Sequence, residues 1–192
     1  MNIAVPSDLI VSSGVIAFAL LWAYSGRLSE ESAVRQTVEK IVTLPAPFWI
    51  VVAVAAFVIP VFDYWITGRS HGNALGGFLP WNDAGGYFYC AEKFLLGIND
   101  VAECSRRPFY PVFFADLLWL TGNHMQLALL LQAIIVGCAV VILCWTTIHR
   151  LTMPGAAAAY ATLYLFAAQY CSALMMTENA GLLFGTLGLA LL

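Results

Sequence analysis

The sequence predicts an all-α, polytopic membrane protein with an extracytoplasmic loop that carries two interfacial helices. Of its 192 residues, 61% are hydrophobic and only 10% are charged, whereas a soluble globular domain has about 25% charged residues. Several apolar runs also approach the roughly 20 residues that a helix needs to cross the hydrocarbon core. No basic stretch suits a nucleic acid, so nucleic-acid binding is excluded.

Residues 1–45 form the first predicted unit, an N-terminal helix followed by a cytoplasmic loop. The apolar run Leu9–Tyr24 lacks the positive flank of a signal peptide, so we expect a retained helix. The next stretch, Ser25–Lys40, places three basic residues in a short loop, namely Arg27, Arg35 and Lys40. The positive-inside rule assigns such a loop to the cytoplasmic side.

Residues 46–192 form the second predicted unit. Spanning helices are expected over Pro47–Ile66, Met125–Ile148 and Ala156–Met176, since each run extends about 30 Å at about 1.5 Å per residue. The last run, Ala180–Leu192, reaches only about 20 Å. We therefore expect the chain to stop within a helix, either because it is truncated or because a second chain completes it.

The segment Thr67–Leu120 is polar and interrupted by glycine and proline, so it is expected to be the extracytoplasmic loop. Its apolar runs Tyr87–Leu96 and Phe109–Leu120 are too short to cross a membrane and predict helices along the interface. This loop has four basic residues against the three on the other side, so their number alone leaves the orientation undecided. The orientation is kept because four acidic residues offset the basic ones, namely Asp83, Glu92, Asp100 and Glu103.

An acidic residue stands among glycines and aromatic residues in "GGFLPWNDAGGYFYCAEKFLLG", Gly76–Gly97. Helical spacing places Asp83 at the start of an amphipathic helix, on one stripe with Tyr87. Gly85 and Gly86 would let a substrate or another backbone approach this helix closely. The alternative is that Asp83 is an N-cap and that Gly97 ends the helix.

Further charged residues follow on the same predicted side of the membrane. Arg106 and Arg107 directly precede Pro108, and paired guanidinium groups suit a phosphate, although anchoring to lipid headgroups is the alternative. Glu178 lies between two apolar runs, where an acid is costly unless it faces water, a partner or a site. A connecting turn at the interface is the alternative for Glu178.

Two of the five cysteines, Cys90 and Cys104, flank the turn between the predicted interfacial helices. In an oxidising space they are predicted to approach each other and to be able to form a disulfide, with two unpaired thiols as the alternative. The other three lie in apolar runs, and none of the five has zinc-ligand spacing. No cofactor is indicated, and dependence on a divalent metal stays open.

The stretches "WNDAGGY", "SRRPFYP" and "TENAGLL" resemble the N-terminal part of polytopic C-type glycosyltransferases, which use polyprenyl-phosphate sugars. This clan includes the protein O-mannosyltransferases and aminoarabinose transferases, and the resemblance covers Pro47–Leu192. It implies transfer of a hexosyl or pentosyl group from a polyprenyl-phosphate donor to an extracytoplasmic glycan, lipid or protein acceptor, at the bacterial inner (plasma) membrane. Asn82 stands where the clan commonly has the first of two acids.

The same resemblance implies roles for individual residues. Asp83 matches the catalytic base, and Glu178 resembles a second acid of the site. Substrate-binding residues would be Tyr87, Arg106 and Arg107, with the arginines on the donor phosphate.

Two other classes of function remain open from the sequence. A transporter subunit would use Asp63, Asp116 and Glu178 as acids on a proton or solute path. A non-catalytic membrane partner would contribute its helices to a larger complex.

Overall fold

The computed structural model describes residues 32–42, 44–98, 102–150, 153–170 and 172–192, and the chain is mostly helical. The predicted helix Leu9–Tyr24 lies outside the described residues. Within the predicted cytoplasmic segment, α2 (Ala33–Val42) is a helix.

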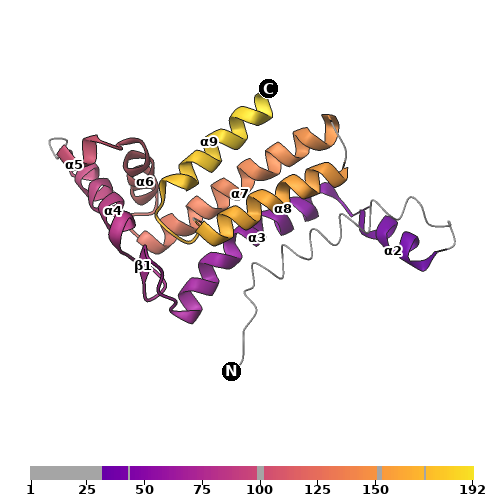
Figure 1. Ribbon diagram of the computed structural model, residues 1–192, viewed down its shortest axis with the longest axis horizontal. Coiled ribbons are helices and arrows are strands. Elements are labelled where there is room, and N and C mark those ends of the chain that lie inside the picture. The colour runs from indigo at the N-terminus through magenta and orange to yellow at the C-terminus, as the bar shows by residue number, and fades with distance from the viewer. Residues whose placement is uncertain (1–31, 43, 99–101, 151–152, 171) are drawn as a thin grey trace.

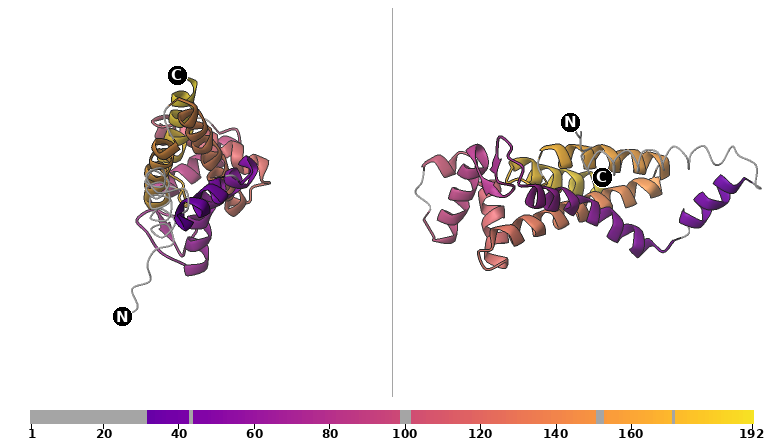
Figure 2. Two further views of the ribbon diagram at one scale, coloured as in Figure 1. Left: turned by 90° about the vertical axis from the view of Figure 1, so that its right-hand side faces the viewer. Right: turned by 90° about the horizontal axis from the view of Figure 1, so that it is seen from below.

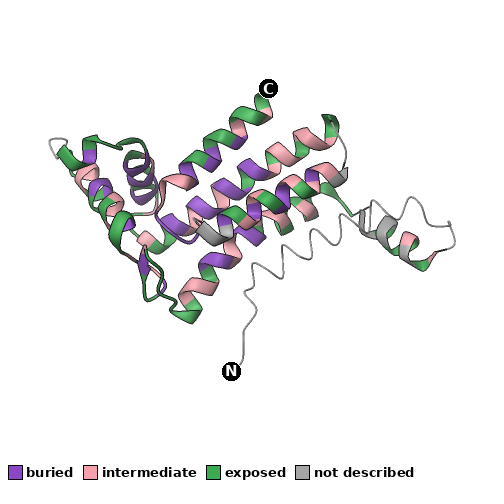
Figure 3. Ribbon diagram, viewed as in Figure 1, coloured by how far each residue is buried: buried purple, intermediate pink, exposed green. Residues whose placement is uncertain are grey.

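Four helices lie side by side and form the long body of the molecule (Figures 1 and 2). They are α3 (Ala46–Thr67), α7 (Met125–Arg150), α8 (Met153–Tyr170) and α9 (Thr177–Leu191). α7 contacts the other three, and its buried residues lie between Ala128 and Val140, in the part nearer its N-terminus (Figure 3). Among the described residues, α3 and α7 are the helices long and apolar enough to cross a membrane.

Close packing between α3 and α7 explains part of this arrangement. A Cβ atom on Gly137 of α7 would lie only 3.2 Å from the Cβ of Phe57 on α3, so the absence of a side chain lets the two helices approach. The Phe57 ring in turn makes edge-to-face contacts with Tyr160 and Tyr164 of α8. Apolar and aromatic side chains thus join three helices into one core.

A smaller group of elements lies at one end of this body (Figure 1). The strands β1 (Ala74–Leu75) and β2 (Leu79–Pro80) form an antiparallel hairpin. The hairpin leads into α4 (Asn82–Leu95), α5 (Ala102–Ser105) and α6 (Phe109–Leu120). The chain is therefore helical over Phe109–Leu120 and over most of Tyr87–Leu96, and α4 packs against α6 over a buried apolar core.

The end of α4 confirms that Gly97 stops the helix. Gly97 has a φ of +71°, in the left-handed region that favours glycine. Its N–H donates to the carbonyl of Phe94, and the N–H of Ile98 donates to the carbonyl of Lys93. These two bonds form a Schellman motif, which satisfies carbonyl groups that the helix leaves without partners.

A disulfide joins Cys90 of α4 to Cys104 of α5, with a Cα–Cα distance of 5.4 Å. The predicted approach of these two cysteines is confirmed. The bond ties α5, and the chain that enters α6, to the middle of α4.

The expected helix Ala156–Met176 is wrong at its C-terminal end. α8 ends at Tyr170, and α9 begins at Thr177, earlier than the expected Ala180. Between them, Ser172–Met175 are buried and lie outside a regular helix, and the Ser172 N–H donates to the Ala167 carbonyl. The carbonyl of Leu174 instead accepts hydrogen bonds from the Met176 N–H and from the side chains of Gln132 and Asn179. These contacts give the buried Leu174 carbonyl hydrogen-bond partners outside a helix.

Candidate functional site

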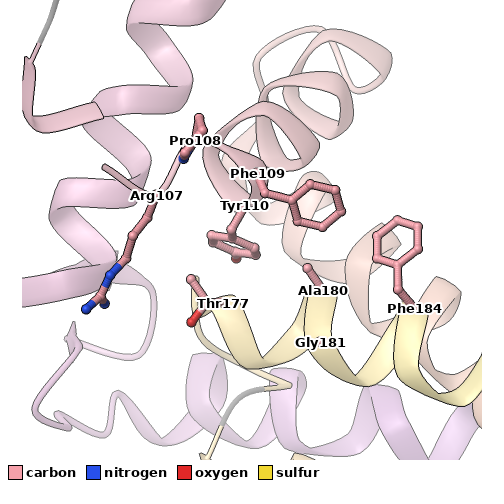
Figure 4. Close-up of a pocket in the computed structure, with 8 residues that line it drawn as sticks. All are labelled: Arg107, Pro108, Phe109, Tyr110, Thr177, Ala180, Gly181 and Phe184. Atoms are coloured by element: carbon pink, nitrogen blue, oxygen red, sulfur yellow. The ribbon is translucent and has the colours of Figure 1, made fainter. Parts of the chain in front are cut away.

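A pocket of about 440 Å³ lies between the N-terminal ends of α6 and α9 (Figure 4). Most of its lining is apolar or aromatic, with Arg107 at one end. At the other end, the rings of Phe109 and Phe184 lie edge to face with centroids 5.1 Å apart. The lining residues are Arg107, Pro108, Phe109, Tyr110, Thr177, Ala180, Gly181 and Phe184.

Arg107 lies between a disulfide-bonded cysteine and the N-cap residue of α6. The disulfide holds Cys104 three positions earlier, and Pro108 is the N-cap residue of α6. The exposed guanidinium donates a hydrogen bond from Nη1 to the Tyr87 hydroxyl at 3.3 Å. This interaction with Tyr87 is the main cause that raises the pKa of Arg107, and the charges of Asp83 and Glu178 act in the same direction. The effects of the two carboxylates are the smallest of these causes.

Tyr87 links the arginine to the buried part of the site. Its ring makes an edge-to-face contact with Tyr110, with centroids 5.4 Å apart. Tyr110 is buried, and its hydroxyl donates to Oε1 of Gln132 at 2.8 Å. The predicted substrate residue Tyr87 therefore lies beside Arg107, and an aromatic contact couples it to the pocket wall.

Asp83 is exposed in the first turn of α4. The N-cap residue of this helix is Trp81, and no side-chain capping hydrogen bond forms there. The capping explanation of Asp83 is therefore wrong. Asp83 does not line the pocket, although its charge acts on Arg107.

The glycines after Asp83 lie in different surroundings. A Cβ on Gly85 would make ordinary contact with the Pro80 carbonyl at 3.5 Å, while one on Gly86 would meet no atom within 4 Å. Neither glycine is thus needed for a close backbone approach in this structure.

Glu178 lies in the first turn of α9, half-buried, and its Oε2 accepts a hydrogen bond from the Thr177 hydroxyl at 3.1 Å. Thr177 lines the pocket, whereas Glu178 does not. Arg106 is exposed and also lies outside the lining. The two arginines were expected to act as a pair, but only Arg107 lines the pocket.

The acids of the alternative transport path are not gathered in one place. Asp63, near the end of α3, forms an ion pair with Arg69 at 3.2 Å. Asp116 is exposed on α6, a helix of 12 residues. Across the described residues, no three His, Cys, Asp or Glu side chains cluster so that they could hold a metal ion.

Sequence reasoning did not identify Tyr110, Gln132 or the apolar lining from α9 as parts of the site. Gln132 carried a usable signal, because a side-chain amide within an apolar helix needs a hydrogen-bond partner. The α9 lining carried none, since Ala180, Gly181 and Phe184 are ordinary in an apolar helix.

Comparison of the chain with protein-family models, curated proteins and solved structures finds no match.

Proposed function

We propose that this chain is a multi-pass integral membrane glycosyltransferase, or the N-terminal part of one, in the bacterial inner membrane. It would transfer a sugar from a polyprenyl-phosphate donor to an extracytoplasmic glycan, lipid or protein acceptor. The observation that carries the proposal is the apolar pocket with Arg107 at one end and two carboxylates within electrostatic reach of that arginine.

The shape and chemistry of the pocket suit an isoprenyl phosphate. Its apolar lining would take the first isoprene units, while the guanidinium of Arg107 would hold the phosphate through charge-assisted hydrogen bonds. In this arrangement α3 and α7 cross the bilayer, and α4 and α6 lie along its outer surface. The donor chain would then enter the pocket from the lipid.

The proposed reaction is a direct displacement at the anomeric carbon. An acceptor hydroxyl or amine attacks this carbon, a new bond to the sugar forms, and the bond between the sugar and the phosphate oxygen breaks. The carboxylate of Asp83 takes the acceptor proton, and the phosphate leaves with the electron pair under stabilisation by Arg107. Glu178 is proposed as a second acid that orients the donor or acceptor.

Binding of farnesyl phosphate, a short isoprenyl phosphate, tests the proposal. The full chain in lipid nanodiscs should bind farnesyl phosphate more tightly than farnesol, which lacks the phosphate. Arg107→Gln should remove most of this preference, since a charge-assisted bond contributes about tenfold or more in affinity.

Arg106→Gln is the matched control, because Arg106 is the adjacent exposed arginine outside the pocket. It should leave the preference unchanged. Equal effects of the two substitutions would indicate a general attraction of the basic surface for anions and would contradict a specific phosphate site.

A further inference from the structure

One buried side chain bonds to a residue of the α6 wall of the pocket and to the segment just before the α9 wall. Gln132 on α7 is fully buried and does not itself line the pocket. Its Oε1 accepts the hydrogen bond from Tyr110 at 2.8 Å, and its Nε2 donates to the Leu174 carbonyl at 3.1 Å. Tyr110 belongs to the α6 wall, and Leu174 lies just before the α9 wall.

The Leu174 carbonyl connects Gln132 to the start of α9. Asn179 in the first turns of α9 donates to this same carbonyl at 2.9 Å, and the N–H of Met176 also donates to it at 3.1 Å. The pocket residue Thr177 lies between these two donors in the sequence. A single carbonyl therefore accepts hydrogen bonds from Gln132 on α7 and from two residues at the start of α9.

The Tyr110 side of Gln132 leads to the arginine. Tyr110 contacts the ring of Tyr87, and the Tyr87 hydroxyl accepts the hydrogen bond from Arg107. One amide is thus coupled to the cationic end of the pocket through two aromatic rings, and to the apolar wall through one carbonyl. Within an apolar helix, a buried amide with both polar groups satisfied holds its partners in one arrangement.

We propose that Gln132 is a positioning residue that sets the spacing between the α6 and α9 walls of the pocket. Its role in substrate binding rests on the proposed function, because it assumes that an isoprenyl phosphate occupies the pocket. The spacing itself does not depend on that assumption.

The first experiment measures the spacing without any ligand. In the variant Phe109→Cys/Phe184→Cys, with the three cysteines outside the disulfide replaced by alanine, a short bifunctional maleimide should cross-link the two walls, because it can span the space that the two contacting rings fill. Addition of Gln132→Met, which keeps the side-chain length and removes both hydrogen bonds, should slow cross-linking about tenfold or more. An unchanged rate would overturn the proposal.

The second experiment measures binding of farnesyl phosphate to the full chain with its native phenylalanines. Gln132→Met should weaken the affinity about tenfold, and Tyr110→Phe, which removes only the hydroxyl, should weaken it by a smaller factor. The double variant should lose no more than Gln132→Met alone, because the hydroxyl acts through the amide. If the loss of affinity in the double variant equals the product of the two single losses, Gln132 and Tyr110 act independently, which would contradict their proposed coupling.

Tyr160→Phe is the control for loss of an interhelical hydrogen bond elsewhere. The Tyr160 hydroxyl donates to the Ala53 carbonyl at 2.7 Å and joins α8 to α3 outside the pocket lining. It should reduce stability while leaving both cross-linking and affinity unchanged. If Tyr160→Phe weakens affinity as much as Gln132→Met, Gln132 is only a structural residue and the proposal fails.

The two experiments separate the two proposals. A native chain that shows no preference for farnesyl phosphate over farnesol refutes the proposed function, while dependence of cross-linking on Gln132 still supports the positioning role. If the native chain binds farnesyl phosphate and both Gln132→Met and Tyr110→Phe bind it with the same affinity, the positioning role alone is refuted.

Discussion

The carboxylate of Asp83 is exposed in the first turn of α4 and makes no capping bond there. If it is the catalytic base, Asp83→Asn should lower sugar transfer about 10²- to 10⁴-fold, because the amide keeps the shape but cannot accept the proton. Release of isoprenyl phosphate from a panel of isoprenyl-phosphate sugars measures this, with the cell-envelope fraction as the source of acceptor.

Glu92→Gln is the matched control for this prediction. Glu92 is an exposed acid on the same helix and does not line the pocket. Its neutralisation should leave transfer unchanged. If Asp83→Asn retains the native rate, the role of Asp83 as base is wrong.

At the same scale, sequence reasoning selected Asp83, Tyr87, Arg107 and Glu178. In the structure the Tyr87 hydroxyl accepts a hydrogen bond from Arg107, and the charges of Asp83 and Glu178 act on the pKa of Arg107. It could do so because these are polar groups in apolar surroundings, where each one needs a reason to be present. The sequence could not separate Arg106 from Arg107. Which of two adjacent side chains lines the pocket depends on the backbone between α5 and α6, and the sequence alone does not give that backbone conformation.

The disulfide links elements rather than single residues, and it should contribute measurably to stability. Closing a loop of about 15 residues stabilises a fold by about 3 kcal/mol in the chain-entropy account. Cys104→Ser should therefore lower the free energy of unfolding by about 2–4 kcal/mol, measured by urea denaturation in detergent. Cys138→Ala is the control, because Cys138 is a free, exposed cysteine on α7. Equal stability of the two variants would contradict this account.

The hairpin is held against the end of α3 at Gly77. A Cβ there would lie 2.1 Å from the backbone carbonyl oxygen of Tyr64, and Gly77 has a φ of +87°. Gly77→Ala should thus destabilise the fold by more than about 1 kcal/mol, since neither backbone can yield easily.

Gly86→Ala is the opposite case on α4, where an added Cβ meets open space. It should be neutral or stabilise the helix by about 0.5–1 kcal/mol. Thermal unfolding of both variants in the same detergent measures the difference. A Gly77→Ala variant as stable as Gly86→Ala would contradict the close contact with α3.

The bounds of a helix could be predicted from the sequence where a local pattern, such as a long apolar run or a glycine at its end, defines them. The long apolar runs gave α3 and α7 to within two residues at each end, and the pattern around Gly97 gave the end of α4. The prediction failed at the end of α8, because Ser172–Met176 are as apolar as the helix before them. Beyond the end of α8, the Leu174 carbonyl accepts hydrogen bonds from Gln132, distant in sequence, and from Asn179, and such long-range partners have no signal in the local sequence.

For the whole molecule, the proposed orientation places the hairpin on the extracytoplasmic side of the membrane and the C-terminal end of α7 on the cytoplasmic side. A cysteine introduced at exposed His71 should react with a membrane-impermeant maleimide in intact cells, in a background whose three cysteines outside the disulfide are replaced by alanine. A cysteine at exposed Arg150 should react only after permeabilisation. The reverse pattern would invert the topology and place Asp83 on the cytoplasmic side.

The most direct measurement of the central claim is photolabelling with farnesyl phosphate that carries a diazirine at the end of its chain. After illumination of the full chain in nanodiscs, mass spectrometry should find the label on the pocket residues of α6 and α9, around Phe109 and Phe184. Unlabelled farnesyl phosphate should compete for this labelling, and Arg107→Gln should reduce it. Label spread over the exposed apolar surface of α3, unaffected by competitor or by Arg107→Gln, would contradict the assignment of the pocket as an isoprenyl-phosphate site.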